Sequence, residues 1–325
     1  MRVLYKSLLF LMSFAAFATG LVNQSLAGDK FKDLSAGRII GLSVRTWPSD
    51  FVGIAKSPFN DKKKTTMVLG TTLGLISVDK PTQRFVQNTF SPLFDWGIPP
   101  VPGIGEIQVG TRALLGGSTN GYILLGLTGY YLGSLAFKHK EGQVGVILTY
   151  KAIATSYLIS HLILKTVFAR KRPFNPLDGP YPPDGLPPKF TTNNWDFGNF
   201  SWPSLGSSRE GSSFPSFHFT MYFAMARVLH RTWDNPWVAY GILLAGLLPD
   251  FDLHNHWVSD MFIRGVIGTV IGEVIYKNFV NKALGDDPTG MSYRKGDRLK
   301  KVIQTATFNP MIGNGYTGVS VRLSL

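Results

Sequence analysis

The chain has 325 residues, of which 33 are Lys or Arg and 20 are Asp or Glu, so its formal net charge is +13. Hydrophobic residues make up 44% of the sequence and charged residues 16%, a composition that can bury a core and excludes a disordered chain. The absence of cysteine excludes disulfides, thiolate metal ligands and a cysteine nucleophile. The positive charge suits a phosphorylated ligand or an acidic membrane surface, and because no nucleic-acid-binding signature accompanies it we expect no nucleic-acid partner.

The first 27 residues have the pattern of a signal peptide. Arg2 and Lys6 precede an apolar stretch over residues 7–22, and Ser25-Leu26-Ala27 supplies small residues where a cleavage site requires them. This pattern predicts an exported protein, periplasmic or associated with a membrane from the extracytoplasmic side. An uncleaved N-terminal membrane anchor is the alternative.

Next comes a segment of mixed character, residues 28–64, which we expect to be extended, with a strand around residues 39–44. Six apolar or amphipathic segments of helical length then predict an all-α domain over residues 65–280, a six-helix bundle; they span residues 65–78, 113–137, 144–170, 219–230, 236–248 and 258–277. Three of these six segments contain charged residues, and the mean hydropathy of the chain is only +0.08. A water-facing or peripherally membrane-associated domain is therefore favoured, although charges that line an internal site also occur in bundles that span a membrane.

Two regions fall outside this helical pattern. Residues 173–215 are rich in proline, glycine and aromatic residues, which predicts a long ordered loop or lid. The tail, residues 281–325, is polar and ends in an alternation of apolar and polar residues that is typical of a half-buried strand. We expect this terminal strand to pair with an N-terminal strand around residues 38–45.

Three short motifs carry candidate chemistry, and the first is basic. Lys165 and Arg172 lie seven residues apart, which places them on one face if the helix continues, with His161 one turn before Lys165. An ammonium beside a guanidinium suits a phosphate, because the guanidinium donates two parallel hydrogen bonds and the ammonium adds charge. A basic helix end that complements the helix dipole is the alternative.

The second and third motifs contain histidines. Ser216 and His218 stand where a helix begins after the loop, and backbone N–H groups at a helix start form an anion site. His256 and Asp260 have the spacing of one helical face, so the carboxylate can hold one ring nitrogen and leave the other free to attack or to accept a proton. A structural Ser-His pair and a simple helix-surface pair are the respective alternatives.

Together these motifs resemble the three-part signature of the type 2 phosphatidic acid phosphatase and vanadium haloperoxidase superfamily, KxxxxxxRP, PSGH and SRxxxxxHxxxD. The resemblance covers roughly residues 65–280 and implies an all-helical, metal-independent phosphatase that needs no cofactor and acts on a phosphorylated small molecule or a lipid phosphate. It implies that His256 attacks phosphorus to form a phosphohistidine, that Asp260 orients it and that His218 is the general acid. It also implies a phosphate held by Lys165, Arg172 and Ser216.

Two of the three motifs depart from the signature. Phe217 stands where the family has glycine, and Pro249-Asp250 stands where it has Ser-Arg, so an acid replaces an arginine that would grip phosphate. Losing one such contact costs about 2–4 kcal/mol of transition-state stabilisation. Nearby basic residues are candidates to replace it, namely Arg170, Lys171, Arg209 and Arg264.

Three other functions stay open. A member without turnover would bind phosphorylated lipid or envelope material through Lys165 and Arg172. A vanadate-dependent haloperoxidase would use the same pocket, since vanadate resembles phosphate in shape and charge. A metal site could form if residues 250–256 were extended, because imidazole and carboxylate ligands would then alternate, at Asp250, Asp252, His254 and His256.

Overall fold

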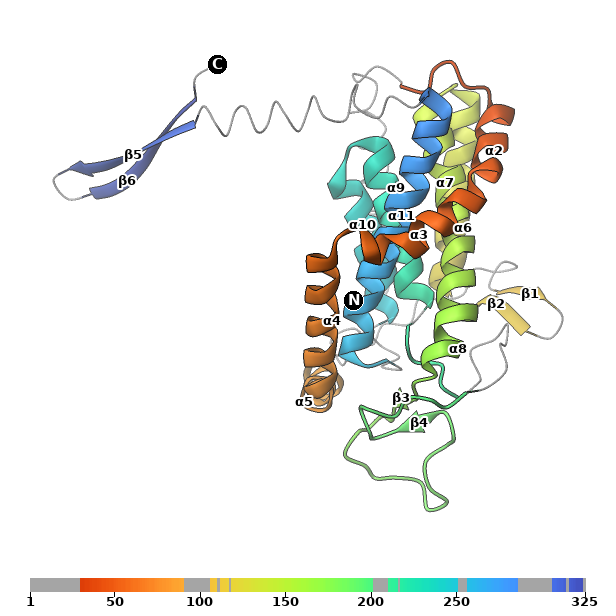
Figure 1. The fold of residues 1–325 in the computed structure, drawn as a ribbon, viewed down its shortest axis with the longest axis vertical. Coiled ribbons are helices and arrows are strands. Elements are labelled where there is room, and N and C mark those ends of the chain that lie inside the picture. Colours follow the sequence, from red (N-terminus) through yellow and green to blue (C-terminus); the bar gives the residue numbers. More distant parts are fainter. Residues whose placement is uncertain are drawn as a thin grey trace, which may run out of the picture. The chain divides into compact units, whose positions relative to one another are not determined.

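The computed structural model describes residues 30–90, 106–109, 112–116, 118–200, 210–215, 217–250, 256–285, 306–313 and 316–323. The expected signal peptide, residues 1–27, lies outside these ranges. The chain divides after Asn278 into two compact units. The first unit is built mainly of helices (Figure 1), which confirms the expected all-α character of this part of the chain.

The segment that we expected to be extended begins with two helices instead. They are α2 (Ala36–Arg45), capped by the Ser35 hydroxyl, which accepts a hydrogen bond from the Arg38 N–H, and α3 (Trp47–Asn60). Ile39 and Leu42 are buried with the spacing of one helical face, so the short apolar run that suggested a strand is a helical stripe. The expected strand around residues 39–44 is therefore wrong.

The next helices are α4 (Lys62–Ser77), which begins after the Asp61 side chain accepts a hydrogen bond from the Lys64 N–H, α5 (Asp79–Phe85) and the π-helical turn η1 (Val86–Phe90). The segment expected as one helix over residues 113–137 is split. Strand β2 (Arg112–Gly116) pairs antiparallel with β1 (Glu106–Val109), and helix α6 (Ser118–Ala136) follows. The two glycines at 116–117 come at this change, in keeping with the weak helical preference of glycine.

A long helix runs through the first unit and positions the first motif. It comprises α7 (Lys140–Ser156), the π-helical segment η3 (Tyr157–Leu164) and α8 (Lys165–Phe168). Among the described residues this helix, Lys140–Phe168, is the one long and apolar enough to cross a membrane, with 56% of its most apolar window buried inside the protein. Ala169 ends it in the left-handed conformation, at φ 45°. Figure 1 shows α8 at the lower end of this helix, close to strand β3.

Three helices complete the body, namely α9 (Phe217–Trp233), α10 (Pro236–Asp250) and α11 (Val258–Leu284). Helix α9 packs antiparallel to the long helix, because Gly145 lies against Trp233 at one end and Tyr157 meets Phe217 at the other. The buried apolar cluster of the unit draws mainly on α6, α7, α9 and α10.

Helix α11 lies parallel to α9 at very short range. A Cβ at Gly268 would come within 2.4 Å of the Thr220 carbonyl oxygen, and one at Gly272 within 2.5 Å of the Ala224 carbonyl oxygen. Larger residues would push the two backbones apart. Because the residue numbers rise together on both helices, the two helices run in the same direction and their N-terminal ends lie at the same end of the unit.

The loop and the tail also differ in part from expectation. Within residues 173–200 and 210–215 the regular structure is one parallel pair of two-residue strands, β3 (Arg172–Pro173) and β4 (Phe190–Thr191). The tail has two strands in an antiparallel hairpin, β5 (Ala306–Gly313) and β6 (Tyr316–Leu323). The expected terminal strand is present, but it pairs with its sequence neighbour, because the residues expected to partner it are in α2.

Candidate functional site

The three motifs meet where three helices begin or end. Lys165 is in α8 at the end of the long helix, His218 is the second residue of α9, and His256 lies just before the start of α11. This convergence follows from the packing, since α9 is parallel to α11 and antiparallel to the long helix. The positive ends of two helix dipoles therefore face the same place, which favours an anion there.

The two histidines share one electrostatic environment. Burial, together with the charges of Lys165, Arg172 and Arg264, lowers the pKa of His218 to about 4. Burial and the same three cations, with Arg264 foremost among them, also hold the pKa of His256 well below its ordinary value. Both rings are therefore neutral at neutral pH in the absence of an anion, and three cations lie close enough to act on both.

The two basic residues of the first motif reach this place by a different path from the expected one. The helix ends at Phe168, so Arg172 is in strand β3 and does not continue the helical face of Lys165. Lys165 is buried, with its Nζ 3.4 Å from His161 Nδ1, as the predicted one-turn spacing requires. The Arg172 Nε donates to the Ser212 hydroxyl at 3.0 Å. Burial lowers the pKa of Arg172 to about 10, which leaves it charged at neutral pH.

Asp260 is held in a fully buried network that sequence reasoning did not find. Arg170 Nη1 donates to Asp260 Oδ1 at 2.6 Å, and Arg170 Nη2 donates to Asp79 Oδ2 at 2.7 Å, with all three side chains at 0% exposure. Ser259 adds to the network at Asp79, because its backbone N–H donates to Asp79 Oδ1 and its hydroxyl donates to Asp79 Oδ2, while the hydroxyl oxygen accepts from Arg170 Nη1 at 2.8 Å. Asp79 is 180 positions before Ser259, so no local motif could have revealed it.

The structure separates the four candidates for the missing arginine. Arg170 is used by the two carboxylates described above, and Lys171 forms an ion pair with Glu210 at 3.6 Å. Arg209 lies outside the described residues. Arg264 is fully buried one turn after Asp260, with its Nη2 2.9 Å from the Ser213 carbonyl oxygen and 3.5 Å from Asp260 Oδ2. Of the three that are described, Arg264 is the one that acts on both histidines.

The other departure from the signature has a packing explanation. Phe217 is buried, and its ring meets the rings of Tyr157 and His161 on the long helix edge to face, with centroids 5.4 Å and 6.4 Å away. The bulky side chain thus helps to join α9 to the long helix. Ser216 lies outside the described residues, and Asp250 is the last residue of α10, with its side chain outside them as well.

The metal-site alternative depends in part on residues that lie outside the described ranges. Asp252 and His254 fall within residues 251–255, which the structure does not describe. Within the described ranges, no group of three or more His, Asp or Glu side chains is arranged to hold a metal ion.

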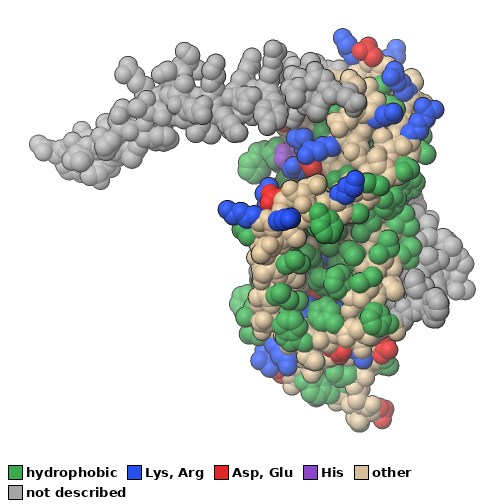
Figure 2. Space-filling model, viewed as in Figure 1, with side chains coloured by type: hydrophobic (Ala, Val, Ile, Leu, Met, Phe, Trp, Pro, Cys, Tyr) green, Lys and Arg blue, Asp and Glu red, His purple; other side chains and the backbone are tan. Residues whose placement is uncertain are grey.

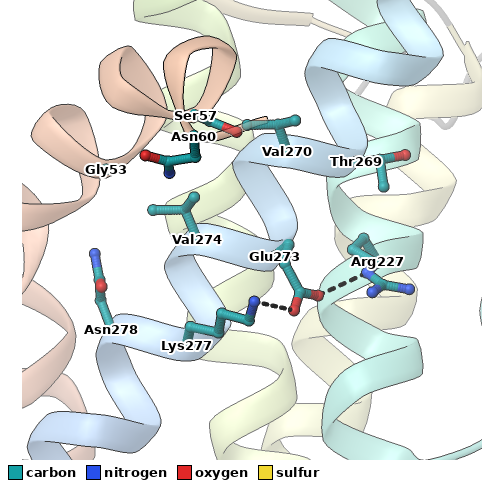
Figure 3. A pocket seen from close by; sticks show the side chains of 10 residues that line it. All are labelled: Gly53, Ser57, Asn60, Arg227, Thr269, Val270, Glu273, Val274, Lys277 and Asn278. Carbon is teal, nitrogen blue, oxygen red and sulfur yellow. Dashed lines mark hydrogen bonds and ion pairs between the residues drawn. The ribbon is translucent and has the colours of Figure 1, made fainter. Parts of the chain in front are cut away.

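A separate cavity of about 330 Å³ lies between α3, α9 and α11 (Figure 3). Glu273 Oε2 pairs there with Arg227 Nε at 2.8 Å, and Glu273 Oε1 pairs with Lys277 Nζ at 3.2 Å. At the helical rise of 1.5 Å per residue, Glu273 is about 20 Å along α11 from Asp260. The cavity is thus distinct from the place where the motifs meet, which we call the histidine site.

Comparison with known proteins finds no matching family model, no matching curated protein and no matching solved structure.

Proposed function

We propose that this protein is a metal-independent phosphatase that hydrolyses a phosphomonoester or a lipid phosphate through a phosphohistidine on His256. The observation that carries the proposal is the convergence of two neutral histidines and three cations on one place, since this supplies a nucleophile, an acid and charge stabilisation together. On this proposal the helical unit is a bundle of the acid phosphatase and haloperoxidase type.

The cations would hold the phosphoryl group. Within the described part of the chain, no carboxylate lies within ion-pair distance of Arg172, so its two terminal nitrogens can face an anion. Lys165 would add a point charge, and Arg264 would supply the cation that the family motif places at position 250. Ser216 would donate its hydroxyl at the start of α9. Such positioned donors stabilise the charge that develops on the transferred phosphoryl group.

The chemistry would run in two balanced steps. In the first, the lone pair of His256 Nε2 attacks phosphorus, the bond from phosphorus to the ester oxygen breaks, and that oxygen takes a proton from His218. In the second, His218 accepts a proton from water, the water oxygen attacks phosphorus, and the bond to His256 breaks. Inorganic phosphate leaves, and both histidines return to their starting states.

The acid role requires that His218 be protonated when substrate is bound. The same cations that lower its pKa in the free protein are offset by a phosphate dianion, so substrate raises the pKa of His218 toward its ordinary value. The same dianion also raises the pKa of His256, but that ring starts from a value well below its ordinary one. The need for a proton on His218 favours activity on the acid side of neutrality.

We also infer that the protein is exported and associates with a membrane from the extracytoplasmic side. Helix α4 starts with exposed Lys62, Lys63 and Lys64 and then exposes apolar side chains, with Met67, Leu69 and Leu73 each more than half exposed. Figure 2 shows hydrophobic side chains gathered over the middle of one face, with Lys and Arg groups above and below. Lysines beside exposed apolar side chains suit a bilayer that carries anionic headgroups.

The experiment that tests the function is phosphate release by the purified full chain in detergent. Wild type, His256→Ala and the control His230→Ala are compared on a soluble phosphomonoester and on phosphatidic acid in micelles, with EDTA and with vanadate. We expect wild type and His230→Ala to turn over in EDTA, vanadate to inhibit, and His256→Ala to lose at least about 10³-fold in rate. His230 is a fair control, because it is a histidine at the other end of α9.

If wild type and His256→Ala are equally inactive, the proposal that the protein is an enzyme is overturned. Binding of phosphatidic acid that depends on Lys165 and Arg172 would then support the alternative of a member that binds without turnover, to which Asp250 in place of the family arginine points. Faster turnover on micellar than on soluble substrate would support the membrane association, and an equal rate on both would count against it.

A further inference from the structure

The resemblance implies that Asp260 orients His256 directly, but another side chain lies between them. Ser213 is fully buried, and its hydroxyl donates to Asp260 Oδ2 at 2.5 Å while lying 3.4 Å from His256 Nδ1. Within the described residues no hydrogen bond joins Asp260 to His256 itself. The carboxylate can therefore influence the imidazole through the hydroxyl of Ser213.

Proton counting fixes the tautomer of His256. A hydroxyl has one proton and two lone pairs, and the Ser213 proton points to the carboxylate, which as an ion can only accept. The remaining contact, between Ser213 Oγ and His256 Nδ1, is then favourable only if Nδ1 carries the proton. His256 Nε2 is left with its lone pair, as a nucleophile requires.

Both ends of this arrangement are held rigidly by the chain. The Ser213 N–H donates to the Arg170 carbonyl oxygen at 2.9 Å, and the Ser213 carbonyl oxygen accepts from Arg264 Nη2 at 2.9 Å. Asp260 is fixed in turn by Arg170 Nη1 and by the Trp257 N–H. The segment around Ser213 can lie this close to the end of α8 because Gly211, at φ 61°, has no side chain. A Cβ at this position would come within 2.8 Å of the Ala169 backbone.

From this geometry we propose that Ser213 is the positioning residue for His256, and that Asp260 acts on the imidazole through the Ser213 hydroxyl. The inference rests on the proposed function. When Nε2 forms its bond to phosphorus, the ring becomes positively charged, and its Nδ1–H strengthens the hydrogen bond to Ser213 Oγ. The Ser213 proton stays on oxygen and donates to Asp260, so no further proton is transferred and the charge is stabilised across the three residues.

The first test reads the tautomer without any turnover. In the full chain labelled with ¹⁵N-histidine, long-range proton–nitrogen spectra should show His256 protonated at Nδ1 in the wild type, and a mixture of tautomers in Ser213→Ala. Assignment comes from the signals lost in His256→Gln. A wild-type His256 protonated at Nε2 would overturn the proposal, whether or not the protein is a phosphatase.

The second test is kinetic and uses p-nitrophenyl phosphate. We expect kcat of Ser213→Ala to fall about 10–100-fold with KM little changed, as for other partners that orient a reacting histidine, and Ser213→Thr, which keeps the hydroxyl, to recover part of the loss. Ser156→Ala is the matched control, because Ser156 is equally buried at the end of α7 and its hydroxyl has no hydrogen-bond partner among the described residues. An unchanged kcat in Ser213→Ala would refute the positioning role.

The two failures can be told apart. Inactivity of the wild type would refute the proposed function, while the tautomer measurement would still decide the placement of the Ser213 proton. If Ser213→Ala does not fold, the wild-type spectrum and the kinetics of Ser213→Thr carry the test, and a Thr variant with altered tautomer but unchanged kcat would overturn the inference.

Discussion

The histidine site and the cavity beside α3 combine the same kinds of side chain in opposite ways. At the histidine site, Asp79 and Asp260 are fully buried and share Arg170, while three other cations act on the histidines; one of these, Arg264, also lies 3.5 Å from Asp260. At the cavity, the cations converge on one carboxylate, Glu273, with Arg231 as a third partner at 3.3 Å, and Lys277 is 60% exposed.

The position of the carboxylates determines how much positive charge each place offers to a ligand. Because Arg170 neutralises much of the charge of the two buried carboxylates, the other cations of the histidine site keep more of theirs for an anion. A carboxylate in the middle of its cations neutralises part of their charge, and water screens the remainder. The histidine site therefore suits an anion and the cavity does not, although both places are rich in Arg and Lys.

The largest expected effect comes from breaking the buried network of the histidine site. Arg170→Met removes the cation that Asp79 and Asp260 share and leaves Asp260 with only the cation of Arg264, at 3.5 Å, among the described residues, so we expect it to lower the free energy of unfolding by about 3–5 kcal/mol, measured by urea denaturation. The control is Arg84→Met, which breaks the Arg84–Asp178 pair, where the side chains are 49% and 57% exposed. That change should cost about 1 kcal/mol or less.

A loss below about 1 kcal/mol in Arg170→Met would contradict this account, because it would mean that the two carboxylates are stable without their partner. If the variant does not fold, Arg170→Lys keeps the charge but offers fewer directed donors, and an intermediate loss in that variant would support the same conclusion.

An intermediate effect concerns pH. His218 has a pKa of about 4 in the folded chain and an ordinary value of about 6.5 when unfolded. Between these values the unfolded chain binds a proton that the folded chain does not, so stability is complete above pH 6.5 and falls as the pH falls toward 4. The melting temperature of His218→Gln should fall less over this pH range than that of the wild type.

Wild type must be compared with His218→Gln because Asp79 has the opposite effect on stability. Burial raises the pKa of Asp79, so this residue stabilises the folded chain as the pH falls. Vanadate or phosphate should restore part of the wild-type loss by offsetting the cations. Identical pH profiles for wild type and His218→Gln would show that His218 is not desolvated among cations as described.

The smallest effect is expected at the cavity. Glu273→Gln removes the central charge, and because Arg227 and Lys277 reach solvent, we expect a change of about 1 kcal/mol or less in unfolding free energy and no change in phosphatase rate. A loss of rate similar to that of His256→Ala would show that the two regions are not independent and would move the functional site toward the cavity.

Sequence patterns located most of the body of the first unit. The apolar periodicity predicted α4, the long helix, α9, α10 and α11 to within a few residues for most of them. It missed α2, whose short stripe of Ile39 and Leu42 also fits a strand, and it missed the change from β2 to α6. A short apolar run does not distinguish a helix from a strand, because a few residues can bury one face with the helical period of 3.6 or with the strand period of 2.

For the histidine site, the motifs determined which residues are candidates, and Lys165, Arg172, His218, His256 and Asp260 were all named from their spacing. Their grouping around one place depended on the parallel packing of α9 on α11, which Gly268 and Gly272 permit by their lack of a side chain. A sequence lists those glycines but does not state which helix they face.

The helical composition, the basic charge and the chemical types available for phosphate chemistry can be read from the amino-acid sequence, because these depend on local periodicity and residue identity. Three interactions depend on how the helices pack: Arg170 binds Asp79 and Asp260, Arg264 acts on the histidines, and Ser213 stands between His256 and Asp260. Hydrogen bonds act over about 3 Å and are directional, so partners as much as 180 positions apart are selected by packing and leave no local pattern.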